Sequence, residues 1–170
     1  MPSENKDIYY MKFAIEQAKL AEEINEVPVG AIVVYTDGTG KNTIVSSAFN
    51  TKEDQHSPSA HAEFKAIEKA SQILGRWRLS DCTIYVTLEP CLMCAGLMQQ
   101  ARISRCVFGA YDPKGGALGS LYSIHKDSRL NHNFTVTSGV CERACADILT
   151  NFFKKKRESL KNSKNYQKHT

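Results

Sequence analysis

A chain of 170 residues is long enough for one domain and buries about 70% of the surface that its unfolded form exposes, so it needs no disulfide or metal merely to fold. With 42% hydrophobic and 24% charged residues, and no apolar run longer than residues 27–35, its composition is that of a globular protein and excludes a membrane-spanning one. The net charge of +4 is uneven, because residues 154–170 hold seven basic side chains against one acid, whereas residues 1–153 hold fifteen against seventeen.

Apolar periodicity and turn-forming residues predict alternating helices and strands along the chain. In chain order we predict a helix over 7–24, a hairpin of strands over 29–35 and 43–50, a polar loop over 51–60 and a helix over 61–74. There follow a strand over 83–89, a helix over 91–101, a strand over 105–110, an irregular segment over 110–121, a strand over 135–140 and a helix over 145–161. This order predicts an α/β fold, a three-layer α/β/α sandwich around a mixed central sheet.

The sequence contains no internal repeat and no linker, so residues 1–153 are predicted to form a single domain whose last helix runs on to about residue 161. Residues 154–170 form a basic C-terminal segment, and we expect its end to be frayed. The first ten residues lack the apolar core of a signal peptide, which predicts a cytoplasmic protein. In that reducing compartment, paired cysteine spacing indicates metal binding or catalysis before disulfides.

Two cysteines three residues apart, Cys91 and Cys94 in TLEPCLMCAGLM (87–98), share one face at the start of a predicted helix. Pro90 is typical of a first helical turn, and the positive end of the helix dipole favours thiolates, the form that binds metals. Two sulfur ligands select zinc or an iron–sulfur cluster over magnesium or calcium.

A second helix start, SPSAHAE (57–63), supplies His61 as a third ligand and Glu63 two residues later. Three protein ligands leave the fourth position of tetrahedral zinc to water, which is the catalytic rather than the structural arrangement. Because bound zinc lowers the pKa of that water to about 7, Glu63 is predicted to take its proton and pass it to a substrate.

Simpler interpretations of these residues stay open from the residues alone. The two cysteines could be small buried apolar side chains or a redox pair, or they could share a structural zinc with Cys141 and Cys145. His61 alone would be a polar helix cap, and Glu63 alone a solvated first-turn acid. The joint occurrence of H-x-E and P-C-x-x-C at two helix starts favours the catalytic metal site.

This pair of motifs is the pattern of zinc nucleobase deaminases, and the resemblance extends over nearly the whole chain. The sequence resembles the bacterial tRNA-specific adenosine deaminases, a family of the cytidine deaminase-like superfamily. The segments that carry the resemblance are EVPVGAIVV (26–34), Asn50, AHAE (60–63), WRL (77–79), TLEPCLMCAG (87–96), VFGAYDPKGGALGSL (107–121), LNH (130–132) and FFKKKR (152–157).

The resemblance implies a cytidine deaminase-like fold, one zinc per subunit, a homodimer, and hydrolytic deamination of adenosine to inosine at the wobble position of a tRNA anticodon. By matched position it implies proton transfer by Glu63, a hydrogen bond from Asn50 to the base, and a contact of Val29 with the ring. The metal ligands that it implies are His61, Cys91 and Cys94.

Residues outside the metal group are predicted to contact the anticodon loop of tRNA. Asp112 and Lys114 lie in the irregular segment after a strand, where functional loops often occur, and are expected to border the nucleotide path as substrate-binding residues. We expect at least one of the adjacent phenylalanines 152 and 153 to anchor the last helix in the core rather than stack on bases. The predicted RNA-binding residues of the basic segment are Lys154, Lys155, Lys156 and Arg157.

The family often has Asp-Pro before the AHAE stretch, where this chain has Ser57-Pro58, so the contacts of that loop are left open. Two other functions are compatible with the metal motif: deamination of a free nucleobase or nucleoside such as guanine or cytosine, and non-catalytic RNA binding by a zinc-stabilised protein. A small substrate would gain little from a polycationic arm, and a structural site has no use for Glu63 beside an open ligand position. The sequence therefore favours a tRNA adenosine deaminase with no contact to membranes.

Overall fold

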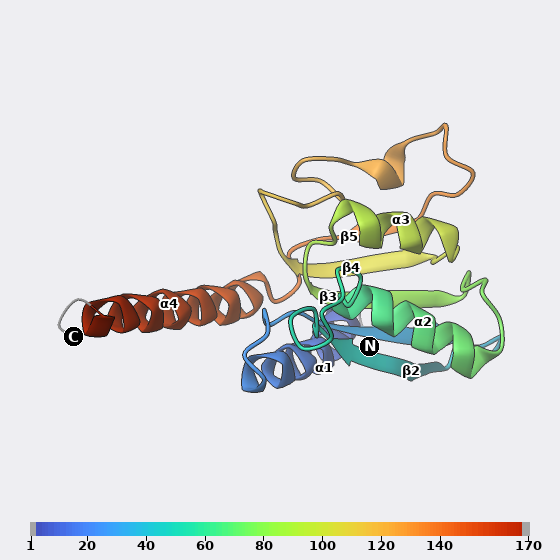
Figure 1. Cartoon of the computed structure of the whole chain (residues 1–170). Coiled ribbons are helices and arrows are strands. Elements are labelled where there is room, and N and C mark those ends of the chain that lie inside the picture. The colour runs from blue at the N-terminus through green and yellow to red at the C-terminus, as the bar shows by residue number, and fades with distance from the viewer. Residues whose placement is uncertain (1–2, 168–170) are drawn as a thin grey trace.

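The computed structural model describes residues 3–167, which form a five-stranded sheet between two layers of helices (Figure 1). The helices are α1 (Ser3–Glu23), α2 (Ala62–Leu74), α3 (Leu92–Gln100) and α4 (Glu142–Gln167), with a short 3₁₀ helix η1 (Ile124–Lys126). The strands are β1 (Gly30–Thr36), β2 (Asn42–Phe49), β3 (Cys82–Leu88), β4 (Arg105–Ala110) and β5 (Thr135–Thr137). The predicted three-layer α/β/α sandwich is confirmed.

The strand order β2-β1-β3-β4-β5 gives the sheet a mixed character, as predicted. β1 pairs antiparallel with β2, which is the predicted hairpin, and also antiparallel with β3. β3, β4 and β5 are parallel. The start of β1 and the ends of β2, β3 and β4 therefore meet at one edge of the sheet, and the segments that leave this edge build the candidate site.

Alternating side chains of the strands pack on opposite layers, because successive side chains in a strand point to opposite faces. On β1, Ala31 and Val33 join the core beneath α2 and α3, whereas Ile32 and Val34 join the core beneath α1 and the first turns of α4. β3 and β4 alternate in the same way. None of the helices in the described residues is both long and apolar enough to cross a membrane.

Close packing of α1 on β1 fixes the edge of the sheet that faces the site. A Cβ atom on Gly30 would lie 2.1 Å from the backbone oxygen of Ala14, so only glycine lets the helix approach this closely. The Gly30 amide also donates a hydrogen bond to the hydroxyl of Thr87, at 3.1 Å, near the end of β3. The chain before β1 and the chain after β3 are therefore held side by side.

The C-terminal part of the chain differs from its sequence-based prediction. The predicted strand over 135–140 is limited to Thr135–Thr137, because the chain turns at Gly139 and Cys141, whose φ angles are 78° and 55°. The last helix begins at Glu142 rather than at residue 145, and it continues to Gln167 rather than ending near residue 161. Figure 1 shows this helix projecting well beyond the sheet. Residues 168–170, also expected to be frayed, lie outside the described residues.

Candidate active site

His61 and Cys91 are the N-cap residues of α2 and α3, and both helices start at the same edge of the sheet. Both residues have extended backbone angles (φ −78° and ψ 148°; φ −72° and ψ 172°), and neither side chain caps its own helix. An N-cap side chain ordinarily accepts a hydrogen bond from the first turn. Here the two side chains are directed toward each other instead, and Cys94, in the first turn of α3, completes the group.

The three predicted metal ligands are brought together by the fold. Nδ1 of His61 lies 3.7 Å from the sulfur of Cys91 and 3.6 Å from the sulfur of Cys94. In tetrahedral zinc sites, bonds of about 2.3 Å to sulfur and 2.0–2.1 Å to nitrogen place these two kinds of ligand atom about 3.5 Å apart. The spacing and the soft donors therefore fit such an ion. Within residues 3–167, no other group of three or more His, Cys, Asp or Glu side chains has all its ligand atoms within 4.8 Å of one another.

Asn50 takes over the capping of α2 that His61 does not perform. The Asn50 side-chain oxygen accepts a hydrogen bond of 2.8 Å from the backbone amide of Ala62, the first residue of the helix. Because the oxygen already accepts this hydrogen bond, we expect Asn50 to contact a base through its amide nitrogen, as a donor. The Asn50 backbone amide donates to the carbonyl of Val29, at 3.1 Å, so the two residues predicted to contact the base lie together at this edge.

Glu63 lies in the first turn of α2 with 4% of its surface exposed. Burial raises the pKa of its carboxyl group to about 7, although hydrogen bonds from its own backbone amide and from the Cys94 thiol oppose the shift. The Cys94 contact places the carboxyl group against the metal-binding group. A bound cation would favour the charged carboxylate and so counteract the effect of burial. A carboxyl group in this position can accept a proton and later donate it.

The two cysteines of the group differ in pKa, so that Cys94 keeps its proton and Cys91 loses it first. The Cys94 thiol and then the His61 imidazole hydrogen-bond to the Cys91 sulfur, and together they lower the pKa of Cys91 to about 4 despite its burial. The hydrogen bond to Cys91 and burial both raise the pKa of Cys94. A metal ion would displace the shared proton and hold both sulfurs as thiolates.

Two details of the sequence interpretation are corrected by the structure. Pro90 is not in the first turn of the helix; it precedes the N-cap Cys91, and its carbonyl accepts a hydrogen bond of 2.9 Å from Ala117. A four-cysteine site is also excluded, because Cys145, near the start of α4, packs into the core on the face of the sheet opposite α3. The α3 cysteines therefore have His61, not Cys145, as their partner.

Asp112 and Lys114 lie in the loop after β4, which runs from residue 112 to residue 120. The Asp112 carboxylate accepts a hydrogen bond of 2.9 Å from the backbone amide of Lys114, an interaction that organises a turn. Both side chains line a cleft of about 640 Å³, which Leu88, Phe153 and Arg157 also line. The cleft therefore links the edge of the sheet that holds the metal-binding group to α4.

The predicted basic residues of α4 lie on different faces of the helix. Arg157 and the 42%-exposed Phe153, four residues apart, face the cleft. Lys155 instead pairs with Glu22 of α1 at 2.8 Å, and Lys156 lies over the ring of Phe152, with 5.3 Å from Nζ to the ring centroid. Phe152 is 4% exposed, so one of the two phenylalanines is a core anchor, as expected. Lys154 is exposed to solvent.

Two buried acids near the site were not identified from the sequence. Glu26 precedes β1, and its Oε1 accepts a hydrogen bond of 2.7 Å from the amide of Asp54 in the loop before α2.

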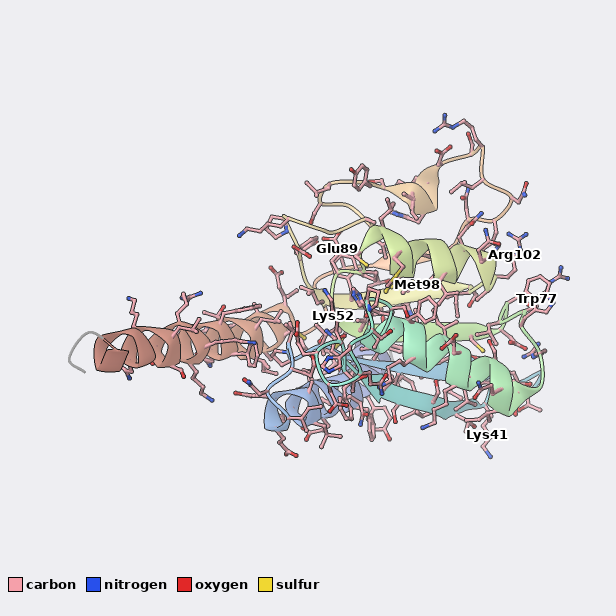
Figure 2. The ribbon with its side chains drawn as sticks, viewed as in Figure 1. Lys41, Lys52, Trp77, Glu89, Met98 and Arg102 are labelled. Atoms are coloured by element: carbon pink, nitrogen blue, oxygen red, sulfur yellow. The ribbon has the colours of Figure 1, made fainter. Side chains whose placement is uncertain are left out.

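Glu89 follows β3 and is 2% exposed. Figure 2 shows it at the end of the molecule where α3 begins, opposite Trp77 and Arg102. Burial alone would raise the pKa of Glu89, but hydrogen bonds from Ser120 and from the amides of Asp112 and Leu118 lower it below its ordinary value. The sequence carries no signal for this role, because the partners of Glu89 lie 23 to 31 residues further along the chain.

Comparisons with known proteins agree with this architecture. The family model for MafB19-like deaminases matches residues 4–157. A tRNA-specific adenosine deaminase of Bacillus subtilis is 45% identical over 156 residues, which cover 92% of this chain and 94% of that protein. One from Haemophilus influenzae is 42% identical over 151 residues, covering 89% of this chain and 85% of that protein.

Solved structures give the same result. A structure from work on A-to-I editing by tRNA:A34 deaminases at the wobble position of transfer RNA superimposes with a TM-score of 0.76 and 38% identity, covering 83% of this chain and 99% of that one. A guanine deaminase from Nitrosomonas europaea superimposes with a TM-score of 0.73 at 19% identity, covering 85% of this chain and 83% of that one, and so shares the fold.

Proposed function

This chain belongs to the family of tRNA-specific adenosine deaminases, and from that membership we propose that it converts adenosine to inosine at the wobble position of a tRNA anticodon. The observation that carries the proposal is the group of His61, Cys91 and Cys94 with the buried Glu63 against it. A structural metal site has no use for a carboxylic acid at that position, whereas a hydrolytic site does. We place the enzyme in the cytoplasm, where its tRNA substrate is processed.

We propose zinc as the metal, one ion per subunit, held by Nδ1 of His61 and the sulfurs of Cys91 and Cys94. Two thiolates and a neutral imidazole balance the charge of Zn²⁺, and the three ligands leave one position open. When bound, zinc supplies a coordinated water with a pKa of about 7, which is a nucleophile at neutral pH.

Glu63 is the proton carrier in the proposed reaction. Its carboxylate accepts a proton from the attacking water and delivers it to N1 of adenine as the C6–O bond forms. It then carries the remaining hydroxyl proton to the exocyclic amino group, so that the C6–N bond breaks and ammonia leaves. The products are inosine and ammonia, and the carboxylate returns to its starting state.

The remaining site residues hold the base. Asn50 presents its side-chain amide nitrogen as a donor for an acceptor atom of the purine, and Val29 provides an apolar contact for the ring. An anticodon loop suits such a pocket, because an unpaired nucleotide can leave its stack at little cost.

The activity is tested with purified protein and bulk tRNA, followed by digestion to nucleosides and measurement of inosine. Free adenosine, guanine and cytosine are incubated in parallel. Inosine in tRNA with no deamination of the free compounds supports the proposal. Deamination of free guanine or cytosine alone would replace it with a small-molecule deaminase.

We further propose that the cleft beside α4 binds the RNA strand that flanks the reacting base. Lys114 and Arg157 offer positive charge on its two walls, and Phe153 offers an exposed ring for stacking. Lys155 already pairs with Glu22 on another face, so its charge is directed away from this path. RNA would therefore contact the Phe153–Arg157 face of the basic segment.

Changing Arg157 to Ala is expected to weaken binding of an anticodon stem-loop about tenfold, because a hydrogen-bonded contact to a phosphate is lost. It should also lower the slope of log affinity against log salt concentration by about one. The matched control is Lys155→Ala, which removes the same charge from the other face and should change affinity less. Affinities are measured by fluorescence anisotropy at several salt concentrations. Equal effects of the two substitutions would contradict a face-specific RNA contact.

We also propose that the protein is a homodimer whose interface borders the active site. Large apolar side chains are exposed around the start of α3 and the end of the 112–120 loop, and Cys91 forms a β-bridge with Gly116 that brings the two segments together. Leu92 and Leu121 are each 52% exposed and Tyr122 is 54% exposed. An apolar patch of this kind is typical of a protein interface.

Replacing Leu92 and Leu121 together with Glu is expected to give a monomer of 19.0 kDa where the unchanged protein has twice that mass. The buried charge in an interface would oppose association. Light scattering after size exclusion measures the mass. The control is Trp77→Glu, an equally exposed aromatic residue at the opposite end of the molecule, which should leave the dimer intact. A monomeric unchanged protein would remove the proposal.

A further inference from the structure

Glu89 is a buried acid that neither the proposed metal chemistry nor the proposed base recognition uses. It lies directly after β3 and two residues before the metal ligand Cys91. A carboxylate that is 2% exposed is unfavourable to bury unless its oxygens accept hydrogen bonds. The identity of its partners therefore indicates what the residue does.

All the hydrogen-bond donors to the Glu89 side chain come from the 112–120 loop. The amides of Leu118 and Ser120 each donate to Oε1 at 3.0 Å, and the amide of Asp112 donates to Oε2 at 3.1 Å. The hydroxyl of Ser120 also donates to Oε2. The two ends of the loop are thus held by one carboxylate.

The middle of the loop contacts the same carboxylate through Gly116. A Cβ atom at this position would lie 2.3 Å from the Glu89 carboxylate, so a larger residue cannot fit without displacing it. Gly116 forms a β-bridge with Cys91, and the next amide, of Ala117, donates to the carbonyl of Pro90 at 2.9 Å. The loop therefore wraps around Glu89 and rests against the segment that carries the metal ligand.

We propose that Glu89 is a positioning residue that fixes the 112–120 loop in register with the metal ligand Cys91, and so sets where the RNA strand runs relative to the reacting base. Lys114, on one wall of the cleft, is carried by this loop between its anchored amides. Without the hydrogen bonds to Glu89, the distance between Lys114 and the metal-binding group would no longer be fixed. This inference rests on the proposed function, because the RNA strand is its ligand.

The test compares Glu89→Gln with Gly116→Ala, which disturb the same contact from its two sides. Glutamine keeps the size of the side chain, but its NH₂ group must face a backbone amide donor of the loop, and alanine pushes the loop off the carboxylate. Each substitution is expected to raise the Kd and the KM for an anticodon stem-loop about tenfold, with kcat changed by about threefold or less. The effects of the double variant should be less than additive.

The matched control is Gly115→Ala, one residue earlier in the same loop. A Cβ atom there would lie 2.9 Å from Oδ2 of Asp112, whereas the hydrogen bond from the Lys114 amide is accepted by Oδ1, so a small shift of the carboxylate can relieve the contact and keep that bond. Its Kd should stay within about twofold of the unchanged protein. Zinc content is measured for every variant and is expected to stay constant, and hydrogen exchange of the Leu118 and Ser120 amides should quicken in Glu89→Gln.

Three results would overturn the inference. The first is a fall in melting temperature with unchanged Kd and KM, which would make Glu89 purely structural. The second is a loss of zinc in proportion to activity, which would make it a support of the metal ligand alone. The third is full additivity of the two substitutions. Because Kd is measured without turnover, weaker RNA binding by the variants supports the inference whether or not the unchanged protein forms inosine. Absence of inosine with the unchanged protein would instead contradict the proposed reaction.

Discussion

Replacing Glu63 with Ala is expected to lower inosine formation by about 10²–10⁴-fold, the range over which a positioned acid or base accelerates a reaction. The side chain accepts a hydrogen bond from Cys94 of the metal-binding group, which places it for both proton transfers. Glu63→Gln should be equally inactive, because it keeps the volume and the polarity but cannot carry a proton.

Stability and metal content separate this effect from misfolding. Glu63 is 4% exposed, and burying a carboxyl group is unfavourable, so its replacement should not lower the melting temperature. Zinc measured by atomic emission should stay at one ion per chain, because the three proposed ligands are untouched. Activity within tenfold of the unchanged protein in either variant would contradict the assignment of Glu63 as the proton carrier.

The sequence predicted the layers and the metal-binding group because both depend on local patterns. Strand and helix periodicity marked nine of the main elements, and the ligands His61, Cys91 and Cys94 occur in short motifs at helix starts. The limits of the helices were less accurate. The end of α4 carries no apolar periodicity beyond residue 161, so nothing in the pattern predicted that the helix continues to Gln167.

Contacts between distant parts of the chain were beyond sequence reasoning. The basic run at 154–157 was predicted as one RNA-binding segment, yet Lys155 pairs with Glu22, 133 residues earlier, and only Arg157 of that run faces the cleft. Glu89 is similar, since its partners follow it by 23 to 31 residues, beyond α3 and β4. A buried acid has no sequence signature of its own, because its cost is offset only by donors that the fold brings to it.

Changing Cys91 to Ser is expected to weaken zinc binding by more than about 100-fold, because a thiolate ligand is replaced by a poor one. Loss of a residue that only hydrogen-bonds to a ligand already weakens metal binding by up to about 100-fold. Inosine formation should fall in step with the bound metal. The fold should persist, because the apolar cores on both faces of the sheet are built without the metal-binding side chains of Cys91 and His61.

The matched control for this substitution is Cys141→Ser, at the start of α4 and outside the metal-binding group. It makes the same exchange of sulfur for oxygen in a similarly half-buried cysteine. Zinc content and activity should stay unchanged. Zinc stoichiometry after dialysis against a weak chelator, together with circular dichroism, measures both expectations. Full zinc retention by Cys91→Ser would place the metal elsewhere. Unfolding of that variant would show a metal needed for the fold, because structural zinc contributes its binding energy to folding whereas a catalytic ion on a preformed core does not.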